Sequence, residues 1–393
     1  MEQTETLKRD LHPSYIELSK AALKNNLDFL RRKAGKGVTI SSVIKGNAYG
    51  HGIDTFLPMA EECGISHFSV FSADEAVKAL QASQNPDTHV MIMGMIADEA
   101  VEWAIGRDIS FYVFEFGRME KAIEAAKKTK KRAKLHILVE TGMHRTGFER
   151  KELDRVIAYL KENREYLKVE GICTHFAGAE SVANYVRIQN QKQRFAEAVK
   201  RFKSEIGPIP RIHAASSAAL LAYPDTIYNM VRIGIAQYGF WPSREVYMLL
   251  KRKDRREGRD PLVRLMCWKS SVMSLKEVEE GEFIGYGNFH LTNRRERIAT
   301  VPVGYKHGYP RNLTNTGFVL IRGERAKVSG LVNMNMITVD VTDIPNVQKG
   351  DEVVIIGKQG SQEISLASFG ELANNLNYEV LTRLPVDLPR MIV

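Results

Sequence analysis

The distribution of apolar and polar residues divides the chain into two regions of different texture. From about residue 20 to residue 243, short apolar runs alternate with stretches in which apolar residues recur every three or four positions. The runs predict buried strands and the periodic stretches predict amphipathic helices. The runs are TISSVI, HFSVFS, HVMIMG, ISFYVF, KLHILVE, VEGICTHF, RIHAASS and MVRIGI.

About eight strand–helix alternations in some 220 residues are the number and length expected of a (β/α)8 barrel. We therefore predict an α/β fold with an N-terminal TIM-type barrel over residues 15–245. A doubly wound open sheet is the alternative, but no G-x-G-x-x-G follows the first strand.

After residue 260 the pattern changes to short strand-like runs separated by turn residues. The runs are LVRLMCWKSSVMSL, RIATVPVG, GFVLIRG, MITVDV and DEVVIIG. Helical periodicity is scarce until ISLASFGELANNL. This pattern predicts a mostly β C-terminal domain over residues 260–393, and we keep open that residues 1–20 pack with it.

Composition and charge narrow the class of protein. Apolar residues make up 44% of the chain and charged residues 26%, as in ordinary soluble proteins. The formal net charge of +9 could indicate nucleic-acid binding, but much of the excess lies in the local runs 127–134, 249–260 and 293–297. No nucleic-acid-binding signature accompanies them, so we interpret them as solvated helix ends and loops in a protein whose ligand could be a small anion.

The chain contains no apolar run long enough to span a membrane and no apolar stretch near its start of the kind found in secretion signals. Its three cysteines, Cys63, Cys173 and Cys267, are too widely spaced to indicate a disulfide framework or a zinc site. We therefore expect a cytoplasmic protein without a metal.

Residues able to carry chemistry follow the predicted strands one after another. In a barrel of this kind the carboxyl ends of the strands build the site. The residues placed there are Lys45, Tyr49, Arg145, His175, His213, Ser216, Ser217, Arg232 and Gly234. Carboxylates are scarce among them, which argues against a two-carboxylate glycosidase, and no metal-ligand spacing occurs.

Lys45 raises the sharpest question, because it ends a buried strand and a buried ammonium group is costly unless it is paired or used. Serine hydroxyls and glycine amides on other strands suit a phosphate group. A lysine beside a phosphate site indicates an imine with an aldehyde cofactor, pyridoxal phosphate (PLP). Each residue also has an ordinary explanation: the histidines could be satisfied barrel residues, and Arg145 could only hold its loop.

The motifs around these residues resemble those of the alanine racemase family. The matching segments are VIKGNAYGHG, ETGMHRTGF, THFAGAE, HAASSAAL, MVRIGIAQYGFWPS, GYGNFH, VPVGYKHGYPR and NYEVLTRLPVDLPR, in family order from about residue 15 onward. The resemblance implies a PLP-dependent barrel with a β-rich C-terminal domain that acts as a homodimer on a small amino-acid substrate.

The resemblance also implies a role for each matching residue. Lys45 would bind the cofactor covalently and act as one of two acid/bases, and Tyr286 of the partner chain would act on the opposite face of the substrate. Both groups have unperturbed pKa values near 10, so both would have to be tuned toward neutrality. Arg232 would hydrogen-bond the pyridine nitrogen. The remaining matches are Tyr49, Ser217, Gly234, Ile235 and Tyr378 for the cofactor phosphate, His175 beside the cofactor ring, Arg145 for the cofactor phenol oxygen and the substrate carboxylate, and Tyr305 and Met334 at the entrance.

Three positions depart from the family pattern. Leu138 replaces the lysine that many members carry as a carbamate, so Arg145 needs another anchor. Glu140 is one candidate, but we favour a small anion such as chloride. Lys306 and His307 replace alanine and aspartate, and Asn335 replaces aspartate. These changes leave the amino-acid substrate open, although alanine is the first expectation.

Other functions stay as alternatives. The closest alternative is a racemase for another amino acid, such as serine, or a broad-spectrum racemase. A non-catalytic PLP-binding protein would have a single domain, and the second domain with Tyr286 argues against it. A barrel decarboxylase would use a C-terminal cysteine, but Cys267 lies away from the matching motifs.

Overall fold

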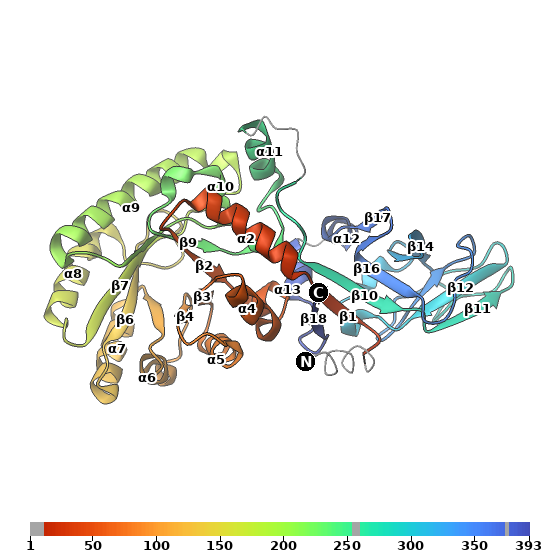
Figure 1. Ribbon diagram of the computed structural model, residues 1–393, viewed down its shortest axis with the longest axis horizontal. Coiled ribbons are helices and arrows are strands. Elements are labelled where there is room, and N and C mark those ends of the chain that lie inside the picture. The colour runs from red at the N-terminus through yellow and green to blue at the C-terminus, as the bar shows by residue number, and fades with distance from the viewer. Residues whose placement is uncertain (1–11, 254–259, 374–376) are drawn as a thin grey trace. The chain divides into compact units, whose positions relative to one another are not determined.

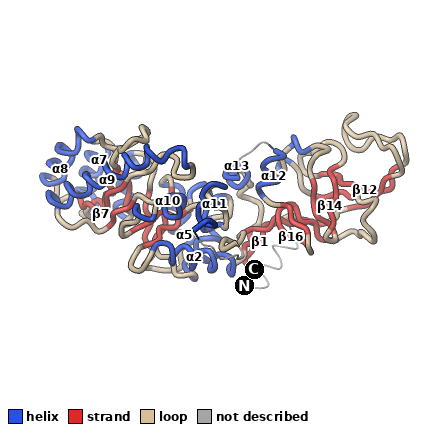
Figure 2. Tube along the Cα trace, turned by 90° about the horizontal axis from the view of Figure 1, so that it is seen from above, coloured by secondary structure: helices blue, strands red, loops and turns tan. Residues whose placement is uncertain are grey.

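The structure is a computed structural model that describes residues 12–253, 260–373 and 377–393. It divides into two compact units. The barrel unit comprises Ala21–Ala48 and Phe56–Arg264, and the β unit comprises the described residues up to Lys20, Tyr49–Thr55 and Leu265–Val393. Figures 1 and 2 show a helix-covered sheet in the first and mostly strands in the second.

The barrel unit contains a parallel sheet of eight strands in the order β8-β7-β6-β5-β4-β3-β2-β9. The strands are β2 (Thr39–Val43), β3 (His67–Val70), β4 (His89–Ile92), β5 (Ser110–Val113), β6 (Ala133–Leu138), β7 (Leu167–Cys173), β8 (Arg211–His213) and β9 (Met230–Ile233). The end strands β8 and β9 lie against each other, and the Arg232 N–H donates to the Ala215 carbonyl at 2.9 Å. The sheet thus closes, which confirms the predicted (β/α)8 barrel.

Most helices of this region lie between successive barrel strands, as the alternating pattern predicts; the first precedes β2 and the last follows β9. They are α2 (Lys20–Ala34), α4 (Ile53–Glu62), α5 (Ala73–Ala82), α6 (Asp98–Gly106), α7 (Phe116–Thr129), α8 (Leu153–Glu162), α9 (Tyr185–Ile206), α10 (Ser217–Ala222) and α11 (Arg244–Lys253). Helix α8 shows why they form: Leu153, Val156, Ile157 and Leu160 repeat every three or four residues and are all buried.

The β unit is built on a ten-stranded sheet in the order β11-β12-β15-β14-β13-β16-β10-β1-β18, with β17 paired to β16. The strands are β1 (Tyr15–Leu18), β10 (Met266–Ser271), β11 (Ser274–Val278), β12 (Glu296–Val301), β13 (Phe318–Ile321), β14 (Glu324–Val328), β15 (Ile337–Asp340), β16 (Glu352–Gln359), β17 (Gln362–Ile364) and β18 (Arg390–Ile392). Two helices, α12 (Leu366–Ala373) and α13 (Asn377–Thr382), complete it. The prediction of a mostly β C-terminal region is confirmed.

Two details of the β unit differ from the sequence prediction. The run LVRLMCWKSSVMSL forms two strands, β10 and β11, because the chain turns at Val272 and Met273. Strand β14 was not expected because it is rich in charged residues. Only Ala326 and Val328 of β14 are buried, so one face of the strand supplies the packing and the other faces solvent.

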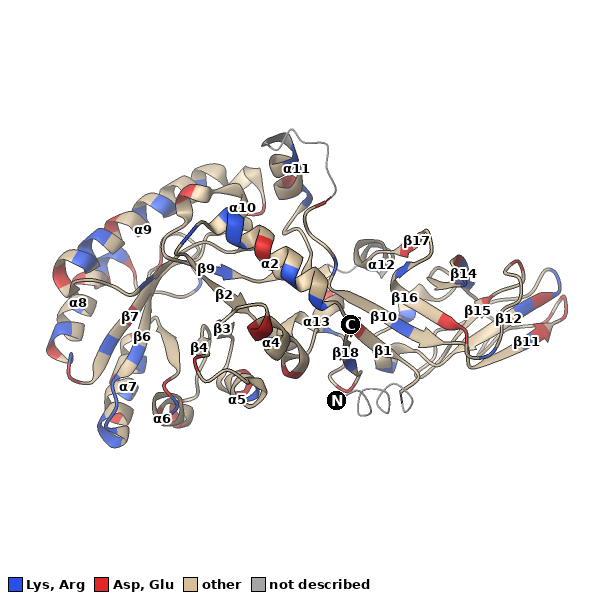
Figure 3. Ribbon diagram, viewed as in Figure 1, with Lys and Arg blue, Asp and Glu red and all other residues tan. Residues whose placement is uncertain are grey.

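Lysine and arginine gather on the outer helices of the barrel unit, where α7, α8 and α9 show most of the blue in Figure 3. The basic run 293–297 lies in the β unit, where Arg294 pairs with Asp343 and Arg295 lies near Glu277. Part of the run 249–260 belongs to α11, and residues 254–259 lie outside the described residues. In the described part of the chain, no helix is both long and apolar enough to cross a membrane.

Candidate active site

Lys45 directly follows β2 and the buried Ile44, at the carboxyl end of the barrel. The expectation that the lysine itself is buried is wrong, because the strand is buried but the residue is exposed in the single chain. Its ammonium group nevertheless lies among enough protein atoms for desolvation to lower its pKa. The charge of Arg145 lowers the pKa further, Glu75 opposes this effect and Arg232 adds to it. Lys45 can therefore lose a proton more readily than an ordinary lysine.

The backbone after Lys45 makes a left-handed turn, α3 (Lys45–Tyr49). Gly46, Asn47 and Ala48 have φ of 63°, 53° and 54°, and Tyr49 has φ of 53°. This conformation costs about 1–2 kcal/mol for each residue with a side chain. It ends the strand sharply and explains why GNAYGHG cannot continue as an ordinary helix.

Glu75, on the first turn of α5, holds this turn in place. Its carboxylate accepts the Gly46 N–H at 2.6 Å with one oxygen and the Phe71 N–H at 2.8 Å with the other. Hydrogen bonds from backbone amides to a carboxylate are among the stronger ones in proteins. Glu75 thus offsets part of the strain and connects the chain after Lys45 to the next strand–helix unit.

The backbone before Lys45 is held by the loop that follows β9. The Val43 carbonyl accepts hydrogen bonds from the Gln237 amide at 3.1 Å and from the Tyr238 hydroxyl at 3.0 Å. Gln237 in turn accepts the Ser42 hydroxyl at 2.8 Å. Lys45 is therefore mounted on a backbone that is fixed on both sides.

Arg232, on β9, is buried and donates to several groups at the ends of neighbouring strands. Its two terminal nitrogens donate to the carbonyls of His213 at 3.0 Å, Thr174 at 2.8 Å and Ala214 at 3.1 Å, and to Nδ1 of His213. Its Nε–H makes no hydrogen bond to any residue that the structure describes. One donor of a rigidly held guanidinium is thus left for a ligand.

The tautomers of two buried histidines follow from Arg232. Arginine only donates, so Nδ1 of His213 must accept and the proton of His213 must lie on Nε2. That nitrogen lies 2.8 Å from Nδ1 of His136 and therefore donates to it. Burial lowers the pKa of both rings, that of His136 to about 3, so both are neutral near pH 7. The two rings orient Arg232 without adding charge.

His175, after β7, belongs to the same electrostatic group. Burial first, and then the charges of Arg232, Arg145 and Lys45, lower its pKa to about 3. A neutral imidazole beside several cations fits a place against an aromatic or anionic ligand.

The residues predicted to bind a phosphate group occupy two places. Ser217 opens α10, and its hydroxyl accepts the Gly234 N–H at 3.0 Å, next to the turn that begins at Ile235. These three are buried and belong to the barrel unit. Tyr49 and Tyr378 belong to the β unit, where their ring centroids lie 6.1 Å apart. The structure thus brings the predicted cradle residues together within each unit.

Arg145 lies in an exposed loop whose shape is set by Glu140. Burial alone would raise the pKa of the Glu140 carboxyl, but backbone N–H groups of residues 142–145 donate to it and lower the pKa overall. The Met143 and His144 amides lie 2.7 and 2.9 Å from its oxygens. The Glu140 oxygens therefore accept backbone N–H groups of the loop and make no ion pair with the Arg145 side chain. No carboxylate in the described part of the chain forms an ion pair with the Arg145 guanidinium.

Leu138 lies in a buried apolar cluster at the end of β6. Its neighbours in the cluster are Met91, Tyr112, Cys173 and Met230. The position at which the resemblance places a carbamylated lysine in many relatives is therefore packed with side chains that carry no charge.

Tyr286 lies in the β unit at the tip of a hairpin and is 72% exposed in the single chain. Tyr305 and Met334 are also exposed, and their segments adjoin: the Tyr305 N–H donates to the Asn333 carbonyl at 3.0 Å and the Lys306 N–H to the Met334 carbonyl at 3.0 Å. The side chains of Tyr286, Tyr305 and Met334 are thus all exposed in the single chain.

The groups that hold the candidate residues in place were not predicted from the sequence. Glu75, Gln237 and Tyr238 bond the chain on either side of Lys45, and His136 bonds His213, each from a distant position and without a recognisable motif. For His136 a signal existed, because it alternates with Leu135 and Ile137 in β6 and so had to face the barrel interior.

Comparisons with known proteins cover both units. The family model described as "Alanine racemase, N-terminal domain" matches residues 18–242, and the one described as "Alanine racemase, C-terminal domain" matches residues 265–392. A protein of Leptospira interrogans named alanine racemase is 34% identical over 386 residues, which cover 98% of this chain and 97% of the relative.

Solved structures agree. The alanine racemase of Clostridium difficile 630 superposes with a TM-score of 0.87 at 30% identity, covering 97% of this chain and 96% of that one. The alanine racemase of Bacillus anthracis, solved with bound L-Ala-P, gives a TM-score of 0.86 at 30% identity, covering 97% and 95%.

A barrel with a readily deprotonated lysine at its mouth, joined to a β-rich unit and matched over both, defines an isomerase of the amino-acid racemase class. More narrowly, the chain belongs to the alanine racemase family.

Proposed function

We propose that this protein interconverts L- and D-alanine with pyridoxal phosphate bound to Lys45. The observation that carries the proposal is the lowered pKa of a lysine at the mouth of the barrel, in a chain whose relatives are named alanine racemases. A readily deprotonated amine is what bonding to an aldehyde requires.

The residues present fit this cofactor. Within the barrel unit, the Ser217 hydroxyl can donate its proton to a phosphate group while its oxygen accepts the Gly234 N–H, and the Ile235 amide is a second proposed donor. Tyr49 and Tyr378 of the β unit match further hydroxyl groups of the family's phosphate site. The Nε–H of Arg232 suits the acceptor nitrogen of a pyridine ring, and His175 would lie beside that ring. When bound, the cofactor supplies an aldehyde carbon for the amino group and a ring that accepts electrons from the neighbouring Cα–H bond.

Arg232 determines how strongly the ring draws electrons. Because arginine keeps its proton, it can hydrogen-bond the ring nitrogen but cannot protonate it. An unprotonated ring is a weaker electron acceptor, which limits side reactions such as transamination. The neutral His213 keeps the guanidinium in place for this function.

Racemisation removes the α-proton from one face of the substrate and returns a proton to the other. We infer that Lys45 serves one face and that Tyr286 of the partner subunit serves the other, in a homodimer. Two fixed groups perform this more simply than one group that must move. The exposure of Tyr286 in the single chain supports its donation to another copy.

Arg145 is the proposed partner of the substrate carboxylate, and Tyr305 and Met334 would narrow the entrance. Lys306 and His307 follow Tyr305 in the same turn, and Lys306 lies 3.9 Å from Asp387. Because these groups at the entrance are polar, an amino acid with a polar side chain, such as serine, is a second candidate substrate.

Borohydride trapping tests the proposal. The purified protein should absorb at about 420 nm, as a protonated PLP imine does, and reduction should fix the cofactor on Lys45. Peptide mass spectrometry locates the label, and a label on any other lysine would refute the assignment. A chiral assay over the L-amino acids then identifies the substrate, with L-alanine expected to be converted fastest.

A further inference from the structure

Tyr286 stands at the tip of a short hairpin that the named strands do not include. Residues 281–284 run antiparallel to residues 290–292, with hydrogen bonds from Gly281 N–H to Thr292 O and from Thr292 N–H to Glu282 O, both 2.9 Å. The last rung joins the Ile284 N–H to the His290 carbonyl at 3.0 Å. Only Gly285 separates this rung from Tyr286.

The tip itself has little packing within the chain. Phe283, Tyr286, Phe289 and Leu291 are all at least half exposed, whereas Ile284 is buried. A two-stranded hairpin alone is marginally stable in water. The direction in which Tyr286 points must therefore be set by contacts at the base of the hairpin.

His290 supplies the first of these contacts. Its Nε2 lies 3.2 and 3.1 Å from the two carboxylate oxygens of Glu296, the first residue of β12. Glu296 is only 4% exposed. Within the part of the chain that the structure describes, His290 is the only group that donates to this carboxylate. A buried carboxylate without a partner is strongly disfavoured, so the pair draws the returning arm of the hairpin onto the sheet.

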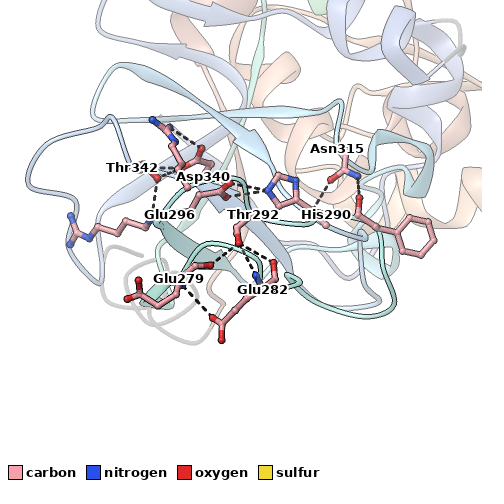
Figure 4. A network of polar contacts seen from close by, with 12 residues as sticks. Glu279, Glu282, His290, Thr292, Glu296, Asn315, Asp340 and Thr342 are labelled. Carbon is pink, nitrogen blue, oxygen red and sulfur yellow. Dashed lines mark hydrogen bonds and ion pairs between the residues drawn. The ribbon is translucent and has the colours of Figure 1, made fainter.

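Asn315 holds the hairpin through the adjacent residue. Its amide nitrogen donates to the Phe289 carbonyl at 2.6 Å, and its amide oxygen accepts the Gly330 N–H at 2.7 Å. Gly330 lies so close to the hairpin that a Cβ there would come within 2.6 Å of the Ile284 carbonyl oxygen. Figure 4 shows His290 directed at Glu296 and Asn315 on its other side.

Thr292 closes the base. Its hydroxyl accepts the Glu282 N–H at 3.0 Å and donates to the Glu279 carbonyl at 2.7 Å. The side chains of Asn315, His290 and Thr292 thus fix the hairpin at residues 289, 290 and 292 (Figure 4).

We propose that the His290–Glu296 pair, assisted by Asn315, is a positioning device that aims Tyr286 at the substrate of the partner subunit. The inference rests on the proposed function, in which Tyr286 is an acid/base. His290 and Glu296 are positioning residues, because they act through the hairpin and not on the substrate. A displacement of about 1 Å at a reacting group can cost on the order of 10²-fold in rate.

Two pairs of substitutions distinguish the effect of losing the hydrogen bond from the effect of changing the size of the side chain. His290→Phe keeps a ring but removes the donor, whereas His290→Gln keeps a donor at a similar reach. Glu296→Leu removes the carboxylate, whereas Glu296→Gln keeps an acceptor. Arg322→Gln is the matched control, because it breaks the ion pair with Asp351 (Nε to Oδ2, 2.7 Å) at the β13–β14 turn of the same sheet.

The first measurement is hydrogen exchange of the full-length, cofactor-loaded protein, followed by mass spectrometry of a peptide spanning residues 281–292. His290→Phe and Glu296→Leu should speed exchange in this peptide by about tenfold or more, since loss of a local contact raises the population of the open form. His290→Gln, Glu296→Gln and Arg322→Gln should leave it close to the parent protein.

The second measurement is kinetic. His290→Phe and Glu296→Leu should each lower kcat by about 10- to 100-fold with little change in KM, and the double variant should be no worse than either alone. The isotope effect with α-deuterated alanine should rise for the enantiomer deprotonated by Tyr286 and stay unchanged for the other. The absorbance band of the bound cofactor should not move.

The outcomes distinguish the inference from the function on which it rests. If Tyr286→Phe is inactive but His290→Phe and Glu296→Leu match Arg322→Gln in exchange and kcat, the positioning role is refuted and the proposed function stands. If exchange rises while kcat and the isotope effects are unchanged, the pair is only structural and the inference is also refuted. If Tyr286→Phe is active, the acid/base role of Tyr286 is refuted and the positioning inference falls with it, while the racemase activity itself is decided by the chiral assay. Should His290→Phe not fold, Glu296→Leu decides, with recovery in Glu296→Gln as the supporting result.

Discussion

Lys45 and Tyr286, the two proposed acid/base residues, are held in opposite ways. Lys45 follows a buried strand, and the backbone on either side of it is bonded to Glu75, Gln237 and Tyr238. Tyr286 is 72% exposed on a hairpin tip that is fixed only at its base. Lys45 thus has a backbone that is anchored on a buried strand, whereas Tyr286 stands on a hairpin tip with little packing in its own chain.

The difference teaches how a chain can serve both faces of a substrate. A barrel delivers side chains from its strand ends toward one mouth, so it approaches a ligand mainly from one side. A group for the opposite face has to come from elsewhere. In the proposed function this group comes from a second copy of the chain, and the exposure of Tyr286 in the single chain agrees with that proposal.

The largest effect is expected from a change at Tyr286, the exposed residue of the two. Tyr286→Phe should retain the cofactor, because no cofactor contact is proposed for it, but lose about 10²–10⁴-fold in kcat, the usual contribution of general acid–base catalysis. Near-normal activity would show that another group is the second base. Mixing Lys45→Ala and Tyr286→Phe subunits should restore activity through hybrid dimers with one intact site. Subunit exchange without any recovery would count against donation in trans.

A smaller loss is expected from the supports of Lys45. Glu75→Ala removes the acceptor for the Gly46 N–H, one of the hydrogen bonds that hold the left-handed turn, so kcat should fall by about 10- to 100-fold. Glu75→Gln keeps an acceptor oxygen and should recover much of the activity. Equal activity in Glu75→Ala and the parent would show that the strand alone positions Lys45.

The pKa of Lys45 tests how the neighbouring charges act on this residue. In the cofactor-free protein its pKa lies below the ordinary lysine value because of desolvation and the charge of Arg145, with Glu75 opposing. Arg145→Gln should therefore raise the pKa and Glu75→Gln should lower it further. The pH dependence of reductive methylation of Lys45, read by mass spectrometry, measures both shifts. Shifts of the same sign in the two variants would contradict this account.

The lowered pKa of Lys45 also determines how the stability of the fold changes with pH. Between the lowered pKa of Lys45 and its ordinary value, the unfolded chain binds more protons than the folded one. Lys45 thus makes the cofactor-free protein more stable as the pH rises through that window, and this gradient should weaken in Lys45→Met.

No effect at all is expected from bicarbonate. Leu138 lies among apolar side chains and cannot form a carbamate, so added bicarbonate should leave kcat unchanged. Replacing chloride by a bulky anion at constant ionic strength should lower activity if a small anion anchors Arg145. Stimulation by bicarbonate would point to carbamylation of another lysine. Indifference to both anions would leave Arg145 without an anionic anchor.

The fold and the candidate residues could be predicted because their signals are local. Each strand of the barrel is a short apolar run and each helix an apolar repeat, and a polar residue that ends a run marks the mouth. The positions of Lys45, His175 and Arg232 at the ends of barrel strands were predicted in this way, while their proposed roles stay predictions. The supports were not, because Glu75 meets Gly46 across 29 positions and His136 meets His213 across 77.

The hairpin illustrates a second limit. Its arms include the polar residues Glu282 and Thr292 and its tip is rich in glycine, so the sequence pattern predicts a loop. Its geometry comes from a buried carboxylate, Glu296, that lies in a basic stretch, NRRER. Sequence alone gave no reason to single out that glutamate from its charged neighbours.

The place of β1 in the β unit has a consequence for the order of events during synthesis. β1 lies between β10 and β18, with the Val393 N–H donating to the Leu18 carbonyl at 2.9 Å, so the sequence of the barrel is inserted between strands that pair with one another. A ribosome adding 5–20 residues per second would need about 20–75 s to pass from Leu18 to Val393. Until β10 is made, about two thirds of the way through that interval, the first strand has no partner strand, and the second partner, β18, is made only at the end. A chaperone that shields nascent chains would therefore find its earliest client segment in this protein at Tyr15–Leu18.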